Sequence, residues 1–158
     1  MKKARLILSA SMFALMGMSA LTFTSCSKDD KVCDAGYEGK DCDVQIRTPM
    51  LGTYTATDKD NDDGTIETYT AVITTNSTVS VVNISNFGNF YSNSQLVTSN
   101  VTKSGNIINF TIPAQKPDNV YKVEGNGTFD ISSKKININY SLDNGISILN
   151  YTGVWNMQ

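Results

Sequence analysis

The chain has 158 residues, which is enough for one ordinary domain and a short stem once an export segment is set aside. It contains no histidine, which excludes a Ser-His-Asp triad, a Cys-His dyad and any histidine metal site. The formal net charge is −2 and no basic run occurs, which argues against nucleic-acid binding.

The N-terminus has the pattern of a secretory leader. Two lysines and an arginine make a positive start, and residues 6–23 are mostly apolar but too short and too diluted for a membrane span. Small residues then precede Cys26, which resembles a lipobox. The pattern predicts a signal peptide over 1–25 and acylation of Cys26, with each buried methylene contributing ~0.8 kcal/mol of membrane anchoring. The alternative, an ordinary leader, would leave an exported free thiol.

The segment after the lipidated cysteine is short and charged. Ser27-Lys28-Asp29-Asp30-Lys31 resembles a tag that directs lipoproteins to the outer face of the outer membrane. The alternative is a solvated tether. Without the leader, the chain has ten basic and 15 acidic residues, which gives a net charge of −5. We therefore expect an outer-membrane lipoprotein whose body is exposed at the cell surface, with the lipid anchor as its membrane contact.

A pair of cysteines marks the stem, which we place at 26–46. Cys33 and Cys42, with Gly36, Tyr37 and Gly39 between them, resemble the last loop of an EGF-like module. In an exported protein this pair is expected to form a disulfide. Closing so short a loop contributes roughly 3 kcal/mol in the chain-entropy model. A zinc or redox role is disfavoured because two cysteines without histidine make a poor metal site.

The body, at 47–158, alternates apolar and polar residues in short runs separated by turn residues, and no run shows sustained helical periodicity. This pattern predicts an all-β fold. About eight antiparallel strands form a meander that closes into a small barrel, with a β-sandwich as the alternative. A parity switch at Val81-Val82 suggests a bulge, and Gly125 and Gly127 suggest a sharp bend. The predicted strands are 50–57, 66–74, 79–84, 96–102, 107–112, 120–130, 136–141 and 146–155.

Four short motifs resemble the calycin-like (lipocalin-like) β-barrel domain of surface lipoproteins. They are Leu51-Gly52-Thr53-Tyr54-Thr55, the strand from Tyr69 to Ile73, the segment Asn83 to Phe87, and Ile112-Pro113-Ala114-Gln115. The resemblance covers roughly residues 47–158. It implies a barrel and no particular activity.

The first hairpin carries the one cluster of carboxylates. Asp58, Asp60, Asp62 and Glu67, with Asp63 beside them, resemble half of an EF-hand loop. Calcium binding is one interpretation and a solvated acidic turn is the other; we expect no other cofactor. Paired-carboxylate glycosidase chemistry would need two acids facing each other across a cleft, and a loop is a poor platform for that.

Aromatic residues recur on the predicted strands and offer a lining for a ligand cavity. An eight-stranded barrel is just wide enough for a filled core or one small ligand, so both interpretations stay open. The first hypothesis is a non-catalytic module that binds a small hydrophobic or sugar ligand; the second is an adhesion or protein-interaction module that uses the barrel loops. We expect no enzyme. The candidate ligand-binding residues are Tyr54, Tyr69, Phe110, Tyr121, Tyr140 and Trp155.

Overall fold

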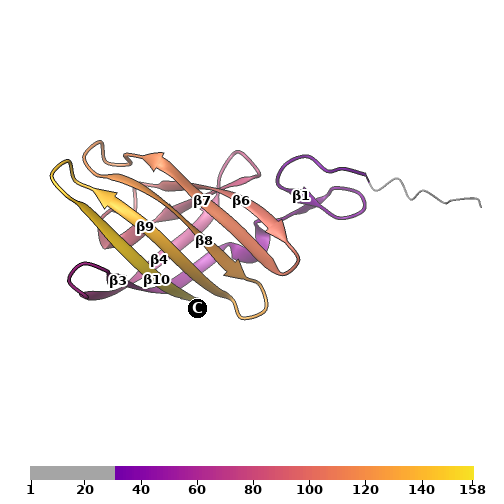
Figure 1. Cartoon of the computed structure of the whole chain (residues 1–158). Helices are drawn as coiled ribbons and strands as arrows, with labels where there is room; N and C mark the ends of the chain where they lie inside the picture. Colours follow the sequence, from indigo (N-terminus) through magenta and orange to yellow (C-terminus); the bar gives the residue numbers. More distant parts are fainter. Residues whose placement is uncertain (1–30) are drawn as a thin grey trace, which may run out of the picture.

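The computed structural model describes residues 31–158, so the predicted signal peptide and Cys26 lie outside the described residues. A two-stranded stem precedes a closed antiparallel barrel (Figure 1). Around the barrel the order is β10-β3-β4-β5-β6-β7-β8-β9, an eight-stranded meander as predicted. The strands are β1 (Tyr37–Glu38), β2 (Val44–Gln45), β3 (Gly52–Asp60), β4 (Ile66–Thr75), β5 (Val81–Ser85), β6 (Val97–Ser104), β7 (Ile107–Gln115), β8 (Lys122–Asp130), β9 (Lys135–Asp143) and β10 (Ile148–Met157). Within residues 31–158, no helix is long and apolar enough to cross a membrane.

The barrel closes where the last strand pairs with the first of the meander. Tyr151 on β10 faces Asp60 on β3, and the register continues without a break to Met157 opposite Tyr54. Most barrel strands bury alternate residues, as β9 does with four apolar side chains between exposed asparagines and a lysine. Closure leaves no free edge in the barrel, which removes the sandwich alternative.

The irregularity in the sheet is not where the sequence pattern placed it. β5 begins at Val81 and pairs regularly with both neighbours, burying Val82 and Ile84. The predicted bulge at Val81-Val82 is wrong, because Val79 precedes the strand and does not count toward its alternation. The register shift lies between Ile112 and Gln115 on β7, next to Pro113, which has no N–H to donate to a ladder.

The two glycines of β8 make room for aromatic rings on the neighbouring strands. Gly125 pairs with Tyr140 and Gly127 pairs with Phe110. A Cβ on Gly125 would lie 2.7 Å from Tyr140 Cβ, and one on Gly127 would overlap the Phe110 ring. These glycines therefore serve close packing inside the barrel.

The meander gives the barrel two different ends. The connections β4–β5, β6–β7 and β8–β9 lie at one end, where the stem is attached, and we call it the stem end (Figure 1). The connections β3–β4, β5–β6, β7–β8 and β9–β10 lie at the opposite end, which we call the far mouth. The β5–β6 connection is the longest of these and contains the short 3-10 turn η2 (Phe87–Asn89).

The stem is fixed to the barrel by buried contacts. Arg47, the residue directly after the stem, is only 4% exposed; its Nη1 donates to the carbonyls of Asn76, Thr78 and Val81 at 2.7–2.9 Å, and its Nε donates to Gln45 Oε1 of the stem at 3.1 Å. A Cβ on Gly36 would lie 2.8 Å from the backbone nitrogen of Ser80, so stem and barrel backbones are in contact. The stem therefore holds one orientation at its end of the barrel.

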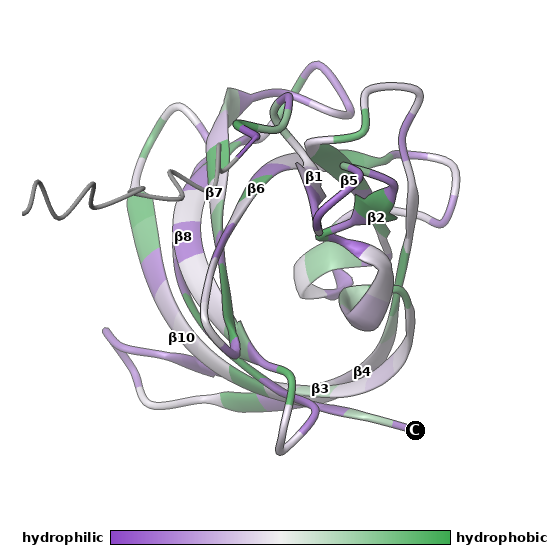
Figure 2. Cartoon of the chain, turned by 90° about the vertical axis from the view of Figure 1, so that its right-hand side faces the viewer, coloured by the Kyte–Doolittle hydropathy of each residue, from purple (hydrophilic) through white to green (hydrophobic). Residues whose placement is uncertain are grey.

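A 3-10 turn, η1 (Thr48–Met50), leads from the stem into the first barrel strand. It buries Met50 completely, and the Tyr54 hydroxyl donates to the Met50 carbonyl at 2.7 Å. Seen end-on from the stem side, the strands form a closed ring with a short helical turn within it (Figure 2). The stem end is thus packed with protein.

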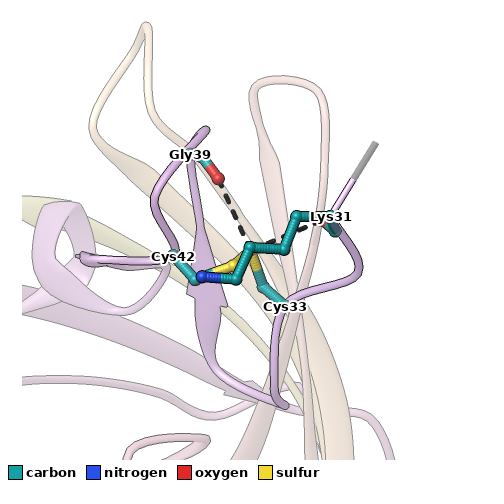
Figure 3. The surroundings of a disulfide bond; sticks show 4 residues. All are labelled: Lys31, Cys33, Gly39 and Cys42. Atoms are coloured by element: carbon teal, nitrogen blue, oxygen red, sulfur yellow. Dashed lines mark hydrogen bonds between the residues drawn. A yellow bond between two sulfur atoms is a disulfide. The ribbon is translucent and has the colours of Figure 1, made fainter. Parts of the chain in front are cut away.

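The predicted disulfide is present. Cys33 is bonded to Cys42, and the Gly39 carbonyl oxygen lies 3.5 Å from Cys33 Sγ (Figure 3). Gly36 and Gly39 have φ of +93° and +91°, a backbone conformation that favours glycine, so they form the tight turns of this loop. The bridge closes the small hairpin of β1 and β2 into a rigid knob.

Replacing Cys33 and Cys42 with serine is expected to loosen the stem and leave the barrel folded. The chain-entropy model assigns about 3 kcal/mol to a loop of this size, and that stabilisation belongs to the stem. Hydrogen exchange should therefore accelerate at the amide of Ile46, which bonds the Gly36 carbonyl, while the β9 amides stay protected. Equal acceleration in stem and β9 would show instead that the two unfold together.

Candidate binding pocket at the far mouth

A buried carboxylate lies inside the barrel near the far mouth. Asp58 is 3% exposed and accepts three hydrogen bonds from side chains on three other strands. The hydroxyls of Tyr69 and Tyr140 donate to its Oδ2 at 2.6 and 2.8 Å. Trp155 Nε1 donates to its Oδ1 at 2.7 Å. Such a set of donors offsets much of the cost of burying an anion.

The position of Asp58 corrects its assignment to the hairpin loop. It lies on β3 and points inward, in the same parity as the fully buried Tyr54 and Ala56. Gly153 faces it across β10, and a Cβ on that glycine would overlap Asp58 Oδ1. The carboxylate therefore occupies the space that a side chain on Gly153 would take.

Of the six aromatic residues predicted to line a cavity, five fill the middle of the barrel. Tyr54, Tyr69, Phe110, Tyr140 and Trp155 are each at most 8% exposed. Trp155 contacts the rings of Tyr54 and Tyr69 with centroids 6.4 and 6.2 Å apart. Among the described residues, every buried polar side-chain atom has a hydrogen-bond partner. The structure thus uses these rings as core, and of the five Tyr140 also lines the pocket at the far mouth.

The sixth residue, Tyr121, lies elsewhere. It is half-buried between β7 and β8 at the far mouth, and its carbonyl accepts a hydrogen bond from the Tyr91 hydroxyl at 2.9 Å. Tyr91 was not predicted as a site residue. It is 1% exposed and supports the loops of the far mouth from inside.

A concave pocket of about 190 Å³ opens at the far mouth, directly above the buried carboxylate. It gathers acidic side chains from the first hairpin, aromatic rings from β9 and β10, and the η2 segment. Its size is below the ~300 Å³ at which drug-sized sites begin, so it suits a small ligand. The lining residues are Asp58, Asp60, Asp63, Thr65, Glu67, Gly88, Phe90, Tyr140 and Tyr151.

The pocket is electrostatically negative. Four of its lining residues are carboxylates and none is basic. Burial raises the pKa of Tyr151 to about 12, and the charges of Asp60, Glu67 and Asp63 add to this effect. The amide of Thr65 donates to Asp63 Oδ1 at 2.8 Å and lowers the pKa of that carboxyl. A cation or a hydrogen-bond donor is the natural complement to such a surface.

The predicted calcium residues are only partly brought together. Asp58, Asp60 and Glu67 line the pocket, but Asp62 does not, and Asp63 takes its place. The amide of Asp62 instead donates to Asp60 Oδ1 at 2.8 Å within the hairpin turn. Within residues 31–158, no group of three or more acidic or cysteine side chains is arranged to hold a metal ion.

Alkaline pH is expected to weaken the barrel. Burial raises the pKa of Tyr54, Tyr69 and Tyr140 above the ordinary value of about 10, and that of Tyr151 to about 12. The unfolded chain would lose these protons first, so their stabilisation is complete below about pH 10 and is lost as the pH rises toward the folded pKa values. Urea unfolding at pH 8, 10 and 11 should show a falling free energy of unfolding. A free energy that stays constant to pH 11 would contradict this expectation.

Comparison with known proteins does not assign the chain to a family. No family model matches the chain, and no curated protein or solved structure matches it with significant similarity. The functional argument therefore rests on the geometry of the far mouth.

Proposed function

We propose that this chain is a non-catalytic lipoprotein of the outer membrane that binds a small ligand at the far mouth of its barrel. In this proposal Cys26 carries the acyl anchor, the disulfide loop is an EGF-like stem, and the barrel is a calycin-like domain exposed at the cell surface. The supporting observation is the pocket of about 190 Å³, where carboxylates and aromatic rings converge.

The orientation of the barrel favours this role. Four residues lie between Cys26 and Lys31, where the described chain begins, and the five steps from one to the other can span at most about 18 Å. The anchor is thereby kept close to the stem end, and Arg47 fixes the stem to that end. The pocket lies at the opposite end, where it would face away from the membrane and be open to ligands from outside the cell.

The pocket favours one of the two ligand classes suggested by the sequence. A purely hydrophobic ligand would strip water from Asp60, Asp63 and Glu67 without offering them a hydrogen bond, which is costly. A sugar or another small molecule with donor groups can bond these carboxylates and lie against Phe90 or Tyr151. We therefore propose a small polar ligand.

Absence of catalysis belongs to the same proposal. The chain has no histidine, and the buried Asp58 is engaged with three donors. An engaged carboxylate is a poor proton acceptor for substrate, which leaves binding as the better use of the site.

Native mass spectrometry of the full chain, purified in detergent from the envelope of the producing cell, tests the proposal. The intact mass should show acyl chains on Cys26, and denaturation should release a small polar molecule in near-stoichiometric amount. An unmodified Cys26 would contradict the anchor. A protein that is bare, and that binds nothing from a fractionated mixture of small polar metabolites, would contradict the binding role.

Exposed apolar side chains at the far mouth favour a second candidate, a protein-interaction module. Six of the large exposed apolar residues belong to the strand ends and loops at this end of the barrel, and Ile146 is 96% exposed. Exposed apolar groups gathered at one end are typical of a contact surface. The six residues are Ile66, Phe90, Leu96, Val120, Ile146 and Ile148.

Photo-crosslinking on intact cells would test the second candidate. A crosslinker at Ile146 should capture one defined protein, and a crosslinker at Asn106, in the β6–β7 connection of the stem end, should not. Equal capture at the two positions would contradict a specific surface at the far mouth.

A further inference from the structure

We infer that the side-chain amide of Asn144 is a site of spontaneous chemical modification, at which the nitrogen of Gly145 closes a succinimide ring that opens to aspartate or isoaspartate. The site lies in the β9–β10 connection at the far mouth (Figure 1). The inference does not depend on the proposed ligand. It is carried by the hydrogen bonds of this turn, by the open space beside Gly145, and by the contrast with a second Asn-Gly pair in the same chain.

The dipeptide Asn-Gly occurs twice in the chain, at Asn126-Gly127 and at Asn144-Gly145. Asparagine followed by glycine favours this reaction, because glycine has no side chain to shield its backbone nitrogen and its backbone reaches conformations that other residues rarely adopt. Gly145 has a φ of +83°, and a Cβ built on it would have no heavy atom within 4 Å outside its chain neighbours. Space for ring closure is therefore available in this turn.

The side-chain carbonyl of Asn144 is held and polarised by the turn. Its Oδ1 accepts hydrogen bonds from the backbone N–H groups of Ile146 and Ser147, both at 2.8 Å. Two backbone donors aimed at one carbonyl oxygen stabilise the negative charge that the oxygen acquires when a nucleophile attacks its carbon. The Nδ2 atom, which must leave as ammonia, makes no hydrogen bond to the part of the chain that the structure describes. The turn therefore activates the carbonyl and leaves the leaving group unrestrained.

The attacking nitrogen is contacted by the residue before the pair. The Gly145 N–H donates to Asp143 Oδ1 at 2.8 Å. A carboxylate in this position can receive the proton as the nitrogen bonds to carbon, which is general-base assistance at hydrogen-bond distance. Because Asn144 Oδ1 reaches past Gly145 to the two following amides, its side chain curls over the nitrogen that attacks it.

The atoms of the reaction balance with water as the one co-reactant. A bond forms between the Gly145 nitrogen and Asn144 Cγ, and the bond from Cγ to Nδ2 breaks. Nδ2 leaves as ammonia with the proton that the Gly145 nitrogen gave up. Water then opens the ring at either carbonyl, and nothing is oxidised or reduced. Both products carry a new negative charge, and isoaspartate also adds a methylene group to the backbone of the β9–β10 connection.

The second Asn-Gly pair is an internal comparison, because it lies inside a strand that is paired on both sides. Asn126 faces Thr111 on β7 and Asn139 on β9. A Cβ on Gly127 would overlap the Phe110 ring, so no space is open beside it. Closing a succinimide there requires β8 to leave the sheet first, which occurs through local unfolding. The same dipeptide is thus free to react at the far mouth and restrained in the barrel wall.

Incubation of the purified full chain in detergent at mildly alkaline pH tests the inference, with peptide mass spectrometry and enzymatic methylation of isoaspartate as readouts. Asn144 should convert to isoaspartate and aspartate at least about tenfold faster than Asn126. Unfolding in urea should accelerate conversion of Asn126 and should not accelerate that of Asn144. Equal rates in the folded protein, or a rate at Asn144 that rises on unfolding, would overturn the inference.

Variants separate the geometry of the turn from the dipeptide itself. Asp143→Ala removes the acceptor of the Gly145 N–H and should slow conversion of Asn144 about threefold or more. Lys122→Ala is the matched control, since Lys122 lies 3.8 Å from Asp143 Oδ2 and takes no part in the reaction; it should change the rate by less than about twofold. Gly145→Ala should slow conversion at least about tenfold, because a side chain shields the nitrogen and disfavours positive φ. If Asp143→Ala converted as fast as the original protein, the dipeptide alone would set the rate and the role given to the turn would be wrong.

Discussion

Replacing Asp58 with alanine is expected to lower the free energy of unfolding by about 3–5 kcal/mol. The change leaves the hydroxyls of Tyr69 and Tyr140 and the indole N–H of Trp155 without their shared acceptor. Each buried donor left unsatisfied costs about 1–3 kcal/mol, and relief of the buried charge returns part of the total. Urea unfolding with an unchanged m value would measure the loss.

Two companion variants make this result specific. Asp58→Asn keeps the shape but presents an NH₂ group to at least one of the three donors, so it should cost less than alanine. Asp62→Ala removes an exposed carboxylate two residues outside the strand and should stay within about 0.5 kcal/mol of the original protein. If Asp58→Ala proved as stable as Asp62→Ala, the buried network would contribute little and the barrel would be held by apolar packing alone.

The strands of this fold can be read from the sequence because their signals are local. The run from Ile136 to Ser141 alternates strictly, and β9 contains all of it at Lys135–Asp143. Short turns between successive runs leave antiparallel pairing as the only arrangement for most neighbours. Closure of β10 on β3 is non-local, so the sequence indicates it only through the family resemblance and the need to cover free strand edges.

The far-mouth pocket could be predicted only in part, because its walls come from distant segments. The sequence places Asp60 and Glu67 together in one acidic hairpin, but Phe90 reaches the same pocket from the residue after η2 and Tyr151 reaches it from β10. Because Asp58 is one of several acidic residues close together in the sequence, it is predicted to lie with them in the hairpin loop. Its parity with Tyr54 and Ala56 was the available sign that it points inward.

Gly153→Ala is expected to destabilise the barrel by about 2–4 kcal/mol, although it adds a single methyl group. The new Cβ would overlap Asp58 Oδ1 and would lie 2.8 Å from Ile138 Cγ2. Overpacking a dense core costs about 1–3 kcal/mol, and displacing the carboxylate would also stretch its hydrogen bonds. Asn156→Ala is exposed on the same strand and should be nearly neutral in the same urea titration.

A double-mutant cycle between Gly153 and Asp58 tests the cause of that loss. In an Asp58→Ala background the space opposite Gly153 is vacant, so the added methyl should cost at least about 1 kcal/mol less than it does alone. Additive costs would place the strain at Ile138 instead. Because the Trp155 indole N–H donates to Asp58, Gly153→Ala should also shift the NMR signal of that N–H. The glycine would then be needed both for packing and for keeping the carboxylate within reach of a ligand.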